Sequence, residues 1–344
     1  MMASSHDLLL SDYNYHLPPE FIAQEPAEPR DTCRLMVINR DSGRIEHRIF
    51  YDILDYLNEG DLLVINDTRV IPARLFGRRQ TGGTVEVLLL HEVRCGEWEC
   101  LVKPGRRVHP GERLEFGEDL DAEVTARTEA GGRLIRFRWE GNFLDVLQRL
   151  GEMPLPPYIK RKLEDAEKYQ TVYSRQPGSA AAPTAGLHFT PSLLKKIKDA
   201  GIGLSSLTLH VGLDTFRPLR HESVVEHQMH SEYYQIPEDT IEAVISTRKS
   251  GGRVVAVGTT TTRALEAAFS GPEPVCSGWT DIFIYPGFIF RVTDMLLTNF
   301  HLPKTSLLLL VSAFAGRNLV LGSYNLAVNE GYRFFSFGDA MLII

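Results

Sequence analysis

The chain has 344 residues, of which 43% are hydrophobic and 24% are charged. This length and composition predict an ordinary soluble globular protein, most simply with two domains. The net charge of −7 and the isoelectric point near 5.9 argue against a protein that coats nucleic acid non-specifically, although they allow a local basic surface.

The four cysteines form no C-x-x-C pair, so a zinc ribbon is not expected. Cys95 and Cys100 lie close enough to bridge across a hairpin, but a reduced pair is the default in the cytosol. The first ten residues have no basic region before their apolar patch, and the longest apolar run, 306–315, is about half the length that spans a bilayer. We therefore expect a cytoplasmic monomer with no membrane partner.

The first 70 residues predict a mixture of helix and strand. A short helical segment begins at Pro18-Pro19-Glu20, and helical spacing recurs over 51–57. Strands are predicted over 34–39 and 61–66, and the second of them stops at Asn66-Asp67-Thr68.

The pattern changes between residues 71 and 151, where short alternating segments are separated by turns such as Thr81-Gly82-Gly83. The predicted strands are 73–76, 84–91, 98–102, 113–116, 121–127 and 134–139, followed by a helix over 142–150. This spacing predicts a small antiparallel β-barrel or sandwich. We interpret 71–151 as a β-barrel domain inserted into a discontinuous α/β domain of residues 1–70 and 152–344.

The remaining chain alternates helix and strand, which predicts a mixed α/β body. Thr190 caps a helix that begins at Pro191 and stops before Gly201. Further helices are predicted over 237–249, 262–269, 306–315 and 323–329. Strands are predicted over 203–211, 253–257, 281–285 and 288–292.

Three histidines follow strand-like runs, where a rigid scaffold usually presents reactive groups. His188 follows the small-residue turn Pro183-Thr184-Ala185-Gly186, His210 ends an alternating strand, and His301 follows Thr298-Asn299-Phe300. Histidine titrates near neutrality, so three such loops indicate proton transfer on a polar substrate. The alternative for each is a loop cap or a core side chain.

The segment 254–266 reads as a strand, a Gly258-Thr259-Thr260 turn and a helix, which suits a polar or anionic ligand group. It is neither G-x-G-x-x-G nor a P-loop, so dinucleotide and triphosphate binding are poorly supported. An ordinary threonine-rich helix cap is the alternative.

Three further patterns leave alternatives open. His227 and His230 are three apart and on a helix would share a face for a metal, but the spacing is not that of H-E-x-x-H. The stiff arm 154–161 carries Tyr158, Lys160 and Arg161, a combination that suits unpaired bases and phosphates. The alternative is an interdomain linker that packs Tyr158 into a seam, and the two roles are compatible. Asp67, beside Arg69 at a strand end, is a candidate site residue or an Asx turn.

Read together, these segments closely resemble the S-adenosylmethionine:tRNA ribosyltransferase-isomerase family of queuosine biosynthesis. The resemblance runs from residue 17 to the C-terminus. The segments that carry it are 22–26, 30–31, 66–75, 154–161, 169–173, 181–189, 207–212, 229–232, 257–260, 298–303 and 332–339. The family fold, a mixed α/β domain with an inserted β-barrel, agrees with the pattern above.

The resemblance implies that the ribosyl part of S-adenosylmethionine is transferred to 7-aminomethyl-7-deazaguanine at the wobble position of tRNA and isomerised. The products would be epoxyqueuosine-tRNA, adenine and methionine, with no metal or redox cofactor. The implied proton-transfer candidates are His188, His210, His230, His301 and Asp67. The donor is expected at Thr184, Gly186, Gly258, Thr259, Thr260 and Asn299, and tRNA at Arg69, Arg74, Tyr158, Lys160 and Arg161.

The chain departs from the family pattern locally. Asp214 stands where the family usually has glycine, Thr261-Thr262 where it has Ser-Val, and Lys304-Thr305-Ser306 where it has Lys-Ser-Thr.

Two other functional classes compete with this interpretation. A metal-dependent hydrolase would use His210, His227 and His230, and a non-catalytic RNA-binding module would bind tRNA without releasing adenine.

Overall fold

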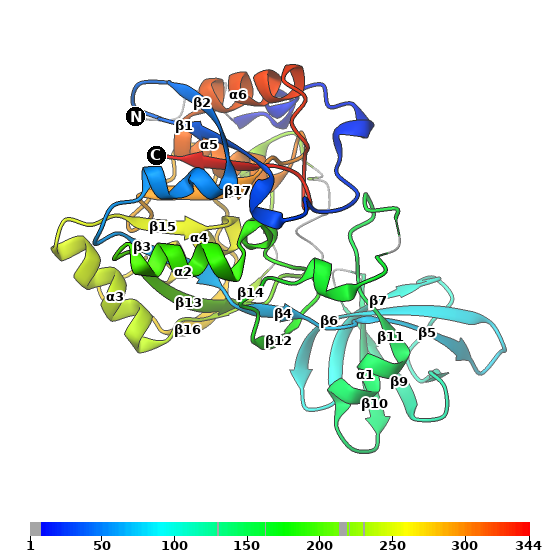
Figure 1. The fold of residues 1–344 in the computed structure, drawn as a ribbon. Coiled ribbons are helices and arrows are strands. Elements are labelled where there is room, and N and C mark those ends of the chain that lie inside the picture. The colour runs from blue at the N-terminus through cyan, green and yellow to red at the C-terminus, as the bar shows by residue number, and fades with distance from the viewer. Residues whose placement is uncertain (1–7, 129–130, 162, 213–218, 220, 230) are drawn as a thin grey trace.

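Two β-sheets organise the chain, and Figure 1 shows them as a larger and a smaller body. The computed structural model describes residues 8–128, 131–161, 163–212, 219, 221–229 and 231–344. A nine-stranded sheet runs through the larger body, and a seven-stranded antiparallel sheet forms the smaller one at lower right. A short parallel pair, β4 (Thr68–Val70) and β12 (Gln176–Ser179), lies between them.

Four parallel neighbours form the centre of the large sheet, in the order β13, β3, β15, β17. β3, β15 and β17 are almost unbroken apolar runs and are buried along their whole length, as expected for parallel strands covered on both faces. Their parallel direction brings all four carboxyl ends to one edge of the sheet. The nine strands are, in spatial order, β16 (Ser277–Thr280), β14 (Glu232–Gln235), β13 (Gly203–Leu209), β3 (Leu62–Asn66), β15 (Val254–Val257), β17 (Met295–Asn299), β18 (Ala340–Ile343), β1 (Arg34–Ile38) and β2 (Ile45–Ile49).

Helices cover both faces of this sheet, because alternate strand side chains point to opposite sides. Leu63 and Val255 pack with α2 and the 3-10 helix η5, whereas Leu62 and Val254 pack with α3 and α4. The remaining two helices, α5 and α6, cover the sheet around Leu296. The helices are η5 (Phe50–Tyr56), α2 (Pro191–Asp199), α3 (Glu238–Lys249), α4 (Thr259–Ala268), α5 (Ser306–Ala315) and α6 (Arg317–Asn329).

Six strands of the small sheet, from β5 to β8 in spatial order, close into an antiparallel barrel, because β5 also pairs with β8. Closure needs Gly77: a Cβ atom there would lie 2.5 Å from the carbonyl oxygen of Glu115. The helix α1 (Phe143–Leu150) packs Val146 and Leu147 into the barrel core, and β11 (Gly151–Glu152) pairs antiparallel with β5. The barrel strands are β5 (Arg74–Arg79), β6 (Thr84–Arg94), β7 (Glu97–Lys103), β10 (Arg133–Trp139), β9 (Leu120–Arg127) and β8 (Arg113–Glu115).

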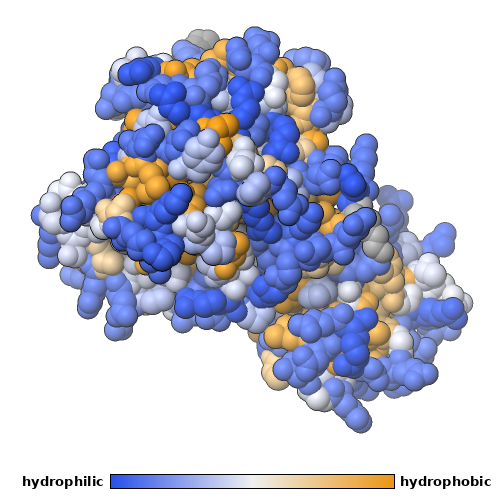
Figure 2. Space-filling model, in the orientation of Figure 1, coloured by the Kyte–Doolittle hydropathy of each residue, from blue (hydrophilic) through white to orange (hydrophobic). Residues whose placement is uncertain are grey.

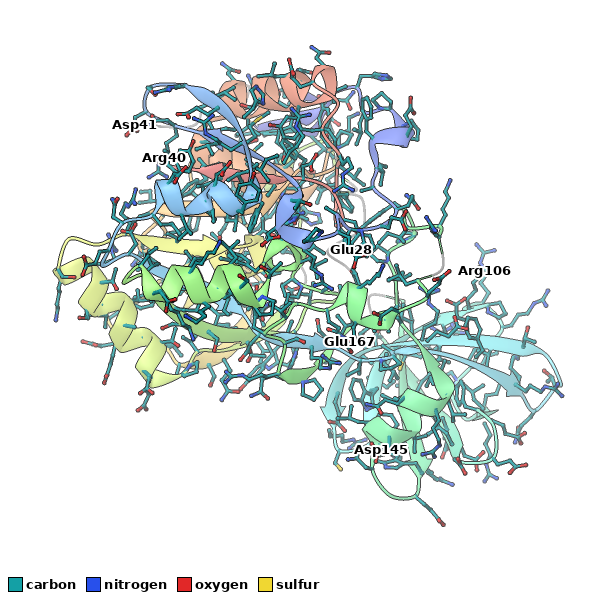
Figure 3. The ribbon with its side chains drawn as sticks, in the orientation of Figure 1. Glu28, Arg40, Asp41, Arg106, Asp145 and Glu167 are labelled. Carbon is teal, nitrogen blue, oxygen red and sulfur yellow. The ribbon has the colours of Figure 1, made fainter. Side chains whose placement is uncertain are left out.

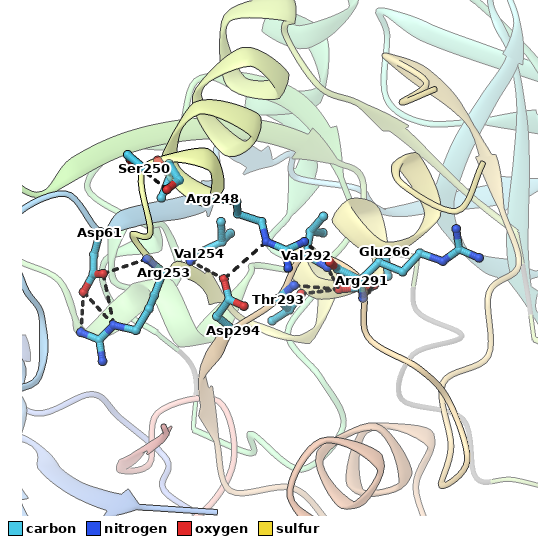
Figure 4. Close-up of polar contacts among 11 residues, drawn as sticks. Asp61, Arg248, Ser250, Arg253, Val254, Glu266, Arg291, Val292, Thr293 and Asp294 are labelled. Carbon is cyan, nitrogen blue, oxygen red and sulfur yellow. Dashed lines mark hydrogen bonds and ion pairs between the residues drawn. The ribbon is translucent and has the colours of Figure 1, made fainter. Parts of the chain in front are cut away.

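Carboxylates secure the opposite, amino-terminal edge of the parallel strands, as Figure 4 shows. Asp61, just before β3, accepts hydrogen bonds from the backbone N–H of Arg253 (2.9 Å) and from its guanidinium Nε (3.1 Å). Glu266 on α4 accepts the backbone N–H groups of Arg291 (2.7 Å) and Thr293 (3.0 Å). These contacts tie the loop before β17 to α4.

The surface shown in Figure 2 is mainly hydrophilic, with hydrophobic residues in small groups. All four cysteines are free. Among the described helices none is long and apolar enough to cross a membrane alone; α5 and α6 pass the same test only as a pair, and they bend by 116° at their junction.

The predicted fold class, a mixed α/β domain with an antiparallel β-barrel, is confirmed. The strands predicted over 281–285 and 288–292 are wrong, because this segment is irregular. Its alternating aromatic residues pack against the α5–α6 core instead of pairing with a strand. Two helices begin earlier than predicted: α4 at Thr259 and α6 at Arg317.

Candidate active site

A cavity lies at the carboxyl edge of the parallel strands, the place where open α/β sheets bind ligands. Its cavity volume is about 40 Å³, less than the roughly 300–1,000 Å³ of a typical small-molecule pocket, so it is a narrow recess in this conformation. Hydroxyl, amide and apolar groups form its wall, with no Asp, Glu, Lys or Arg among the described lining residues. We call it the edge cavity; it is lined by Ala182, Pro183, Thr184, Ala185, Val211, Gly258, Thr259, Thr260, Thr298, Asn299, His301, Leu307, Phe335 and Ser336.

The turn between β15 and α4 brings a helix N-terminus to this cavity. Gly258 adopts φ 93°, a left-handed conformation that favours glycine. Two threonines of the following turn are satisfied internally: Thr261 Oγ1 donates to the carbonyl of Val257 (2.7 Å) and Thr262 Oγ1 to that of Gly258 (3.1 Å). Thr259 and Thr260 line the cavity, where the positive end of the helix dipole favours a polar or anionic group.

Asn66, the last residue of β3, ties three strand ends together. Its Oδ1 accepts the backbone N–H of Leu209 (3.1 Å) and of Thr68 (3.1 Å), and its Nδ2 donates to the carbonyl of Leu209 (2.9 Å). The side chain is fully buried and also reaches Thr260 Oγ1 at 3.4 Å. It therefore sets the spacing of β3, β13 and α4 at the edge cavity.

His188 does not line the edge cavity but reaches it through Asn299. Asn299 Nδ2 donates to His188 Nε2 (3.0 Å) and to the carbonyl of Phe335 (3.2 Å), and its Oδ1 accepts from Thr184 (3.0 Å). With Nε2 accepting, the proton of His188 lies on Nδ1 and points to the thiol of Cys33, 3.2 Å away. Burial, with smaller effects of Arg333 and Arg30, lowers the pKa of His188 to about 3. The imidazole is therefore neutral at pH 7.

His301 lines the cavity directly. Its Nε2 lies 2.9 Å from Thr298 Oγ1, its backbone N–H donates to the hydroxyl of Tyr324 (3.1 Å), and its carbonyl accepts from Tyr15. Burial lowers the pKa of His301 to about 3. This histidine too is neutral at pH 7, and a hydrogen-bonding role suits it better than that of a strong base.

Phe335 supplies the most strained backbone of the wall. Its φ of 73° is rare for a bulky residue, and such strain clusters at functional sites. The ring of Tyr158 packs edge-on against that of Phe335, with centroids 4.1 Å apart, and its hydroxyl lies 2.7 Å from Ser336 Oγ. Tyr158 therefore supports the cavity wall, which corresponds to the seam alternative for the 154–161 arm.

His210 faces a second, larger cavity of about 640 Å³ between the barrel and the large sheet. We call it the interdomain cavity; it is lined by Leu90, His91, Glu92, Trp98, Glu99, Pro177, Gly178, His210, Gly212, Ser231, Glu232, Tyr233 and Trp279. Only a thin segment separates the two cavities, since Val211 lines the first while His210 and Gly212 line the second.

The His210 ring is held from two sides. Its Nδ1 lies 2.8 Å from Thr68 Oγ1, and a Cβ atom at Gly178 would lie 3.0 Å from its Nε2. Burial lowers the pKa of His210, while the charge of Asp67 acts in the opposite direction. Asp67 accepts from Thr208 (2.7 Å) and pairs with Arg175 (2.7 Å). Of His188, His210 and His301, His210 is the one whose pKa is affected by a nearby carboxylate, that of Asp67.

Known proteins resemble this chain along nearly its whole length. A family described as "Queuosine biosynthesis protein" matches residues 10–343. The S-adenosylmethionine:tRNA ribosyltransferase-isomerase of Acetivibrio thermocellus is 55% identical over 338 residues, which cover 97% of this chain and 99% of that protein. The enzyme of the same name from Halothermothrix orenii is 56% identical over 339 residues, with the same coverage.

The chain belongs to the S-adenosylmethionine:tRNA ribosyltransferase-isomerase family. It is therefore a transferase-isomerase, and the family resemblance of the sequence is confirmed. The crystal structure of an S-adenosylmethionine tRNA ribosyltransferase from Thermotoga maritima is also similar, with 42% identity, a TM-score of 0.57 and coverage of 97% of this chain and 100% of that one.

The cations predicted to contact tRNA lie near the junction between the two bodies, and most have carboxylate partners. Arg69 pairs with Glu167, Arg74 with Glu86 (2.6 Å) and Arg161 with Glu25 (2.7 Å). Lys160 is exposed, and its backbone N–H donates to Gln24 (2.8 Å). Figure 3 places Glu28 and Glu167 on neighbouring segments beside this junction. Lys168 pairs with Glu28 there.

Other predicted site residues lie elsewhere. Gly186 does not line the edge cavity; it allows close approach of the Tyr173 hydroxyl, for which a Cβ atom would leave no space. His230 and Asp214 lie outside the described residues. Residues 227–229 are not helical, so no shared helix face forms at His227. Within the described part of the chain no group of three His, Cys, Asp or Glu side chains is placed to hold a metal.

Several residues at or near the two cavities were not predicted from the sequence. Phe335 and Ser336 belong to the 332–339 segment, which was recognised without a role. Cys33 had no signal that linked it to His188, 155 positions away. The barrel residues His91 and Glu99 reach the interdomain cavity only through the packing of two sheets.

The buried histidines predict a stability that falls in acid. For His188 and His301 the folded pKa is about 3 and the unfolded value is about 6.5, so between these values the unfolded chain binds more protons. The free energy of unfolding should therefore decrease as the pH falls below about 6.5, by about 1.4 kcal/mol per pH unit for each histidine. Urea denaturation between pH 7.5 and 4.5 measures this slope. His301→Gln should remove one histidine's share of this slope; a slope equal to that of the wild-type protein would contradict the prediction.

The contact between His188 and Asn299 predicts that His188 positions Asn299. His188→Gln keeps an acceptor for Asn299 Nδ2, whereas His188→Ala leaves that amide without one. Loss of a buried hydrogen-bond partner costs about 1–3 kcal/mol, so turnover of the alanine variant should fall about 5- to 100-fold, with the glutamine variant closer to wild type. Turnover and circular dichroism should be measured together. Equal, severe loss in two folded variants would instead assign His188 a proton-transfer role.

Proposed function

We propose that the protein transfers the ribosyl part of S-adenosylmethionine to 7-aminomethyl-7-deazaguanine at the wobble position of tRNA and isomerises it. The products are epoxyqueuosine-tRNA, adenine and methionine. The observation that carries the proposal is the edge cavity, where Gly258, Thr259, Thr260, Thr184 and Asn299 converge in a chain of this family. The proposal includes a cytoplasmic monomer and the domain division at residues 71 and 151.

The uncharged wall of the edge cavity suits the first chemical step. A sulfonium ion buried among neutral groups is poorly solvated, which favours loss of a proton from the adjacent carbon, because this converts the cation to a neutral ylide. Polar groups at the start of α4 and at Asn299 are available for hydrogen bonds to the adenine that leaves. No step of this scheme needs a metal or a redox cofactor.

His210 is the best-placed proton acceptor in this scheme. It lies beside the wall shared by the two cavities, and the charge of Asp67 opposes the effect of burial on its pKa. A base with a pKa closer to the working pH accepts protons more effectively, which favours His210 over His188 and His301. We assign those two neutral histidines to hydrogen bonding around Asn299 and Thr298.

The tRNA is proposed to cross the junction near Arg69, Arg74, Lys160 and Arg161. The pairs of Arg69 and Arg161 are solvent-exposed, and such pairs contribute only about 0–1 kcal/mol, so phosphates can replace their carboxylate partners at little cost. The acidic net charge of −7 confines RNA binding to such local clusters.

The reaction predicts that adenine and methionine are released together. Purified protein, S-adenosylmethionine and tRNA that carries the deazaguanine precursor should yield both in equal amounts, measured by liquid chromatography. The same reaction after exhaustive chelation should proceed at an unchanged rate. Methyl transfer to tRNA would overturn the proposal, and activity that returns only with zinc would favour a metal-dependent hydrolase.

The proposed RNA contacts predict a change in salt dependence. Each phosphate contact contributes about one unit to the slope of log affinity against log salt, so Lys160→Ala combined with Arg161→Ala should flatten it by about two units at most. Filter binding of tRNA at several salt concentrations gives the slope. Lys195 and Lys249, exposed on α2 and α3, provide a matched double-alanine control. An unchanged slope in the 160/161 variant would show that these side chains stay in solvent.

A further inference from the structure

The interdomain cavity contains an aromatic cluster that the proposed donor site does not use. Trp279 on β16 and Tyr233 on β14 are a cross-strand pair whose ring centroids lie 5.6 Å apart. His91 on β6 of the barrel packs edge-on against Trp279 at 5.4 Å. Although they are large apolar rings, Trp279 is 56% exposed and Tyr233 is 36% exposed. Exposed aromatic rings grouped at a cavity indicate a binding surface.

The charge of this cavity selects among possible ligands. Its described charged lining residues are Glu92, Glu99 and Glu232, with no lysine or arginine. Glu232 forms a buried ion pair with Arg263, and Glu92 accepts the backbone N–H of Gly96 (2.8 Å). Glu99 lies 3.7 Å from His91, directly beside the aromatic cluster. This environment disfavours a phosphate and favours a flat aromatic ligand that carries a positive charge.

Trp98, at the barrel side of this cavity, has a ring N–H that is unpaired within the described part of the chain. Trp98 lines it and is only 7% exposed, yet its ring N–H has no hydrogen-bond partner among the described residues. Unpaired buried donors are rare in native structures and are commonly satisfied by a ligand or water.

We propose that the interdomain cavity binds the acceptor nucleobase, stacked on Trp279 and Tyr233, with its cationic aminomethyl arm toward Glu99. The inference rests on the proposed function, in which the acceptor is an aminomethyl-substituted deazaguanine in tRNA. Bases read from single-stranded RNA are stacked on aromatic side chains in the same manner. Phosphates of the same RNA remain outside, at the cations of the junction.

The placement of the two cavities fits a reaction between two substrates. The segment His210-Val211-Gly212 forms a shared wall, with Val211 toward the edge cavity and His210 toward the interdomain cavity. A donor in the edge cavity and a base in the interdomain cavity would meet at this segment. The barrel thus contributes to acceptor binding through His91 and Glu99, although it lies outside the edge cavity.

Binding measurements test the inference without depending on turnover. The affinities to measure are those for tRNA with the aminomethyl-deazaguanine, the same tRNA with guanine at that position, and S-adenosylmethionine. Trp279→Ala should weaken both tRNA affinities about 5- to 100-fold, the effect of losing one base–aromatic stack, and Trp279→Phe should restore most of the loss. The S-adenosylmethionine affinity should stay unchanged. Tyr51→Ala, an aromatic residue 49% exposed on η5, is the matched control and should change none of the three affinities.

Glu99→Gln tests the charge separately. It should reduce the preference for the aminomethyl-bearing tRNA over the guanine-bearing tRNA about tenfold, because it removes a charge-assisted hydrogen bond to the arm. Its matched control is the exposed barrel residue Glu118→Gln. Unchanged tRNA affinity in Trp279→Ala, unchanged preference in Glu99→Gln, or a weakened affinity for S-adenosylmethionine would overturn the inference. Failure of the proposed function would appear differently, as a wild-type protein that releases no adenine.

Discussion

The shared direction of β13, β3, β15 and β17 is the constraint on which the rest of the structure depends. Because these neighbours are parallel, the residues after each strand meet at one edge, although they are up to 233 positions apart in sequence between Asn66 and Asn299. Asn66 sets the spacing by binding both backbone groups of Leu209. The amino-terminal edge is secured separately by Asp61 and Glu266, so ligand groups do not compete with these structural carboxylates.

Burial of polar groups at this edge makes charge costly for the fold, and it also provides an uncharged cavity for chemistry. His188 and His301 are held neutral in the core, where their ring nitrogens serve as fixed hydrogen-bonding groups. A protonated imidazole at either place would be an uncompensated buried charge, which is costly. The same exclusion of water creates an uncharged pocket in which a sulfonium substrate would be reactive. Burial also lowers the pKa of His210, but there the charge of Asp67 acts in the opposite direction.

The barrel lies beside β16 and β14, the last two strands at one side of the large sheet, and forms part of the interdomain cavity there. β16 and β14 end the sheet on that side, and their aromatic residues would otherwise be fully exposed at an unprotected edge. His91 covers Trp279 without burying it. The interdomain cavity therefore lies between two separate hydrophobic cores, that of the barrel and that of the large sheet. Its width depends on how the barrel packs against the large sheet.

Local patterns in the sequence determined much of the architecture. The apolar runs of β3 and β15, the Thr190-Pro191 helix start and the evenly spaced barrel strands follow from burial and capping, which depend on near neighbours in the chain. The pattern was misleading over 281–292, because aromatic alternation there reflects packing on helices, and local sequence does not distinguish such packing from a strand. Motifs around Gly258, Asn299 and His301 were recognised as site elements, and the structure brings them to one cavity.

Only the tertiary structure decided what each group does within that framework. The sequence alone treated His188, His210 and His301 as equivalent, whereas burial and partners separate a histidine behind Asn299, one in the cavity wall and one at a second cavity. It also left two roles open for Tyr158, stacking on a base and packing in a seam, and the contact with Phe335 corresponds to the second. Protonation state, hydrogen-bond direction and the boundary between two cavities depend on contacts between residues far apart in the chain, so no local pattern encodes them.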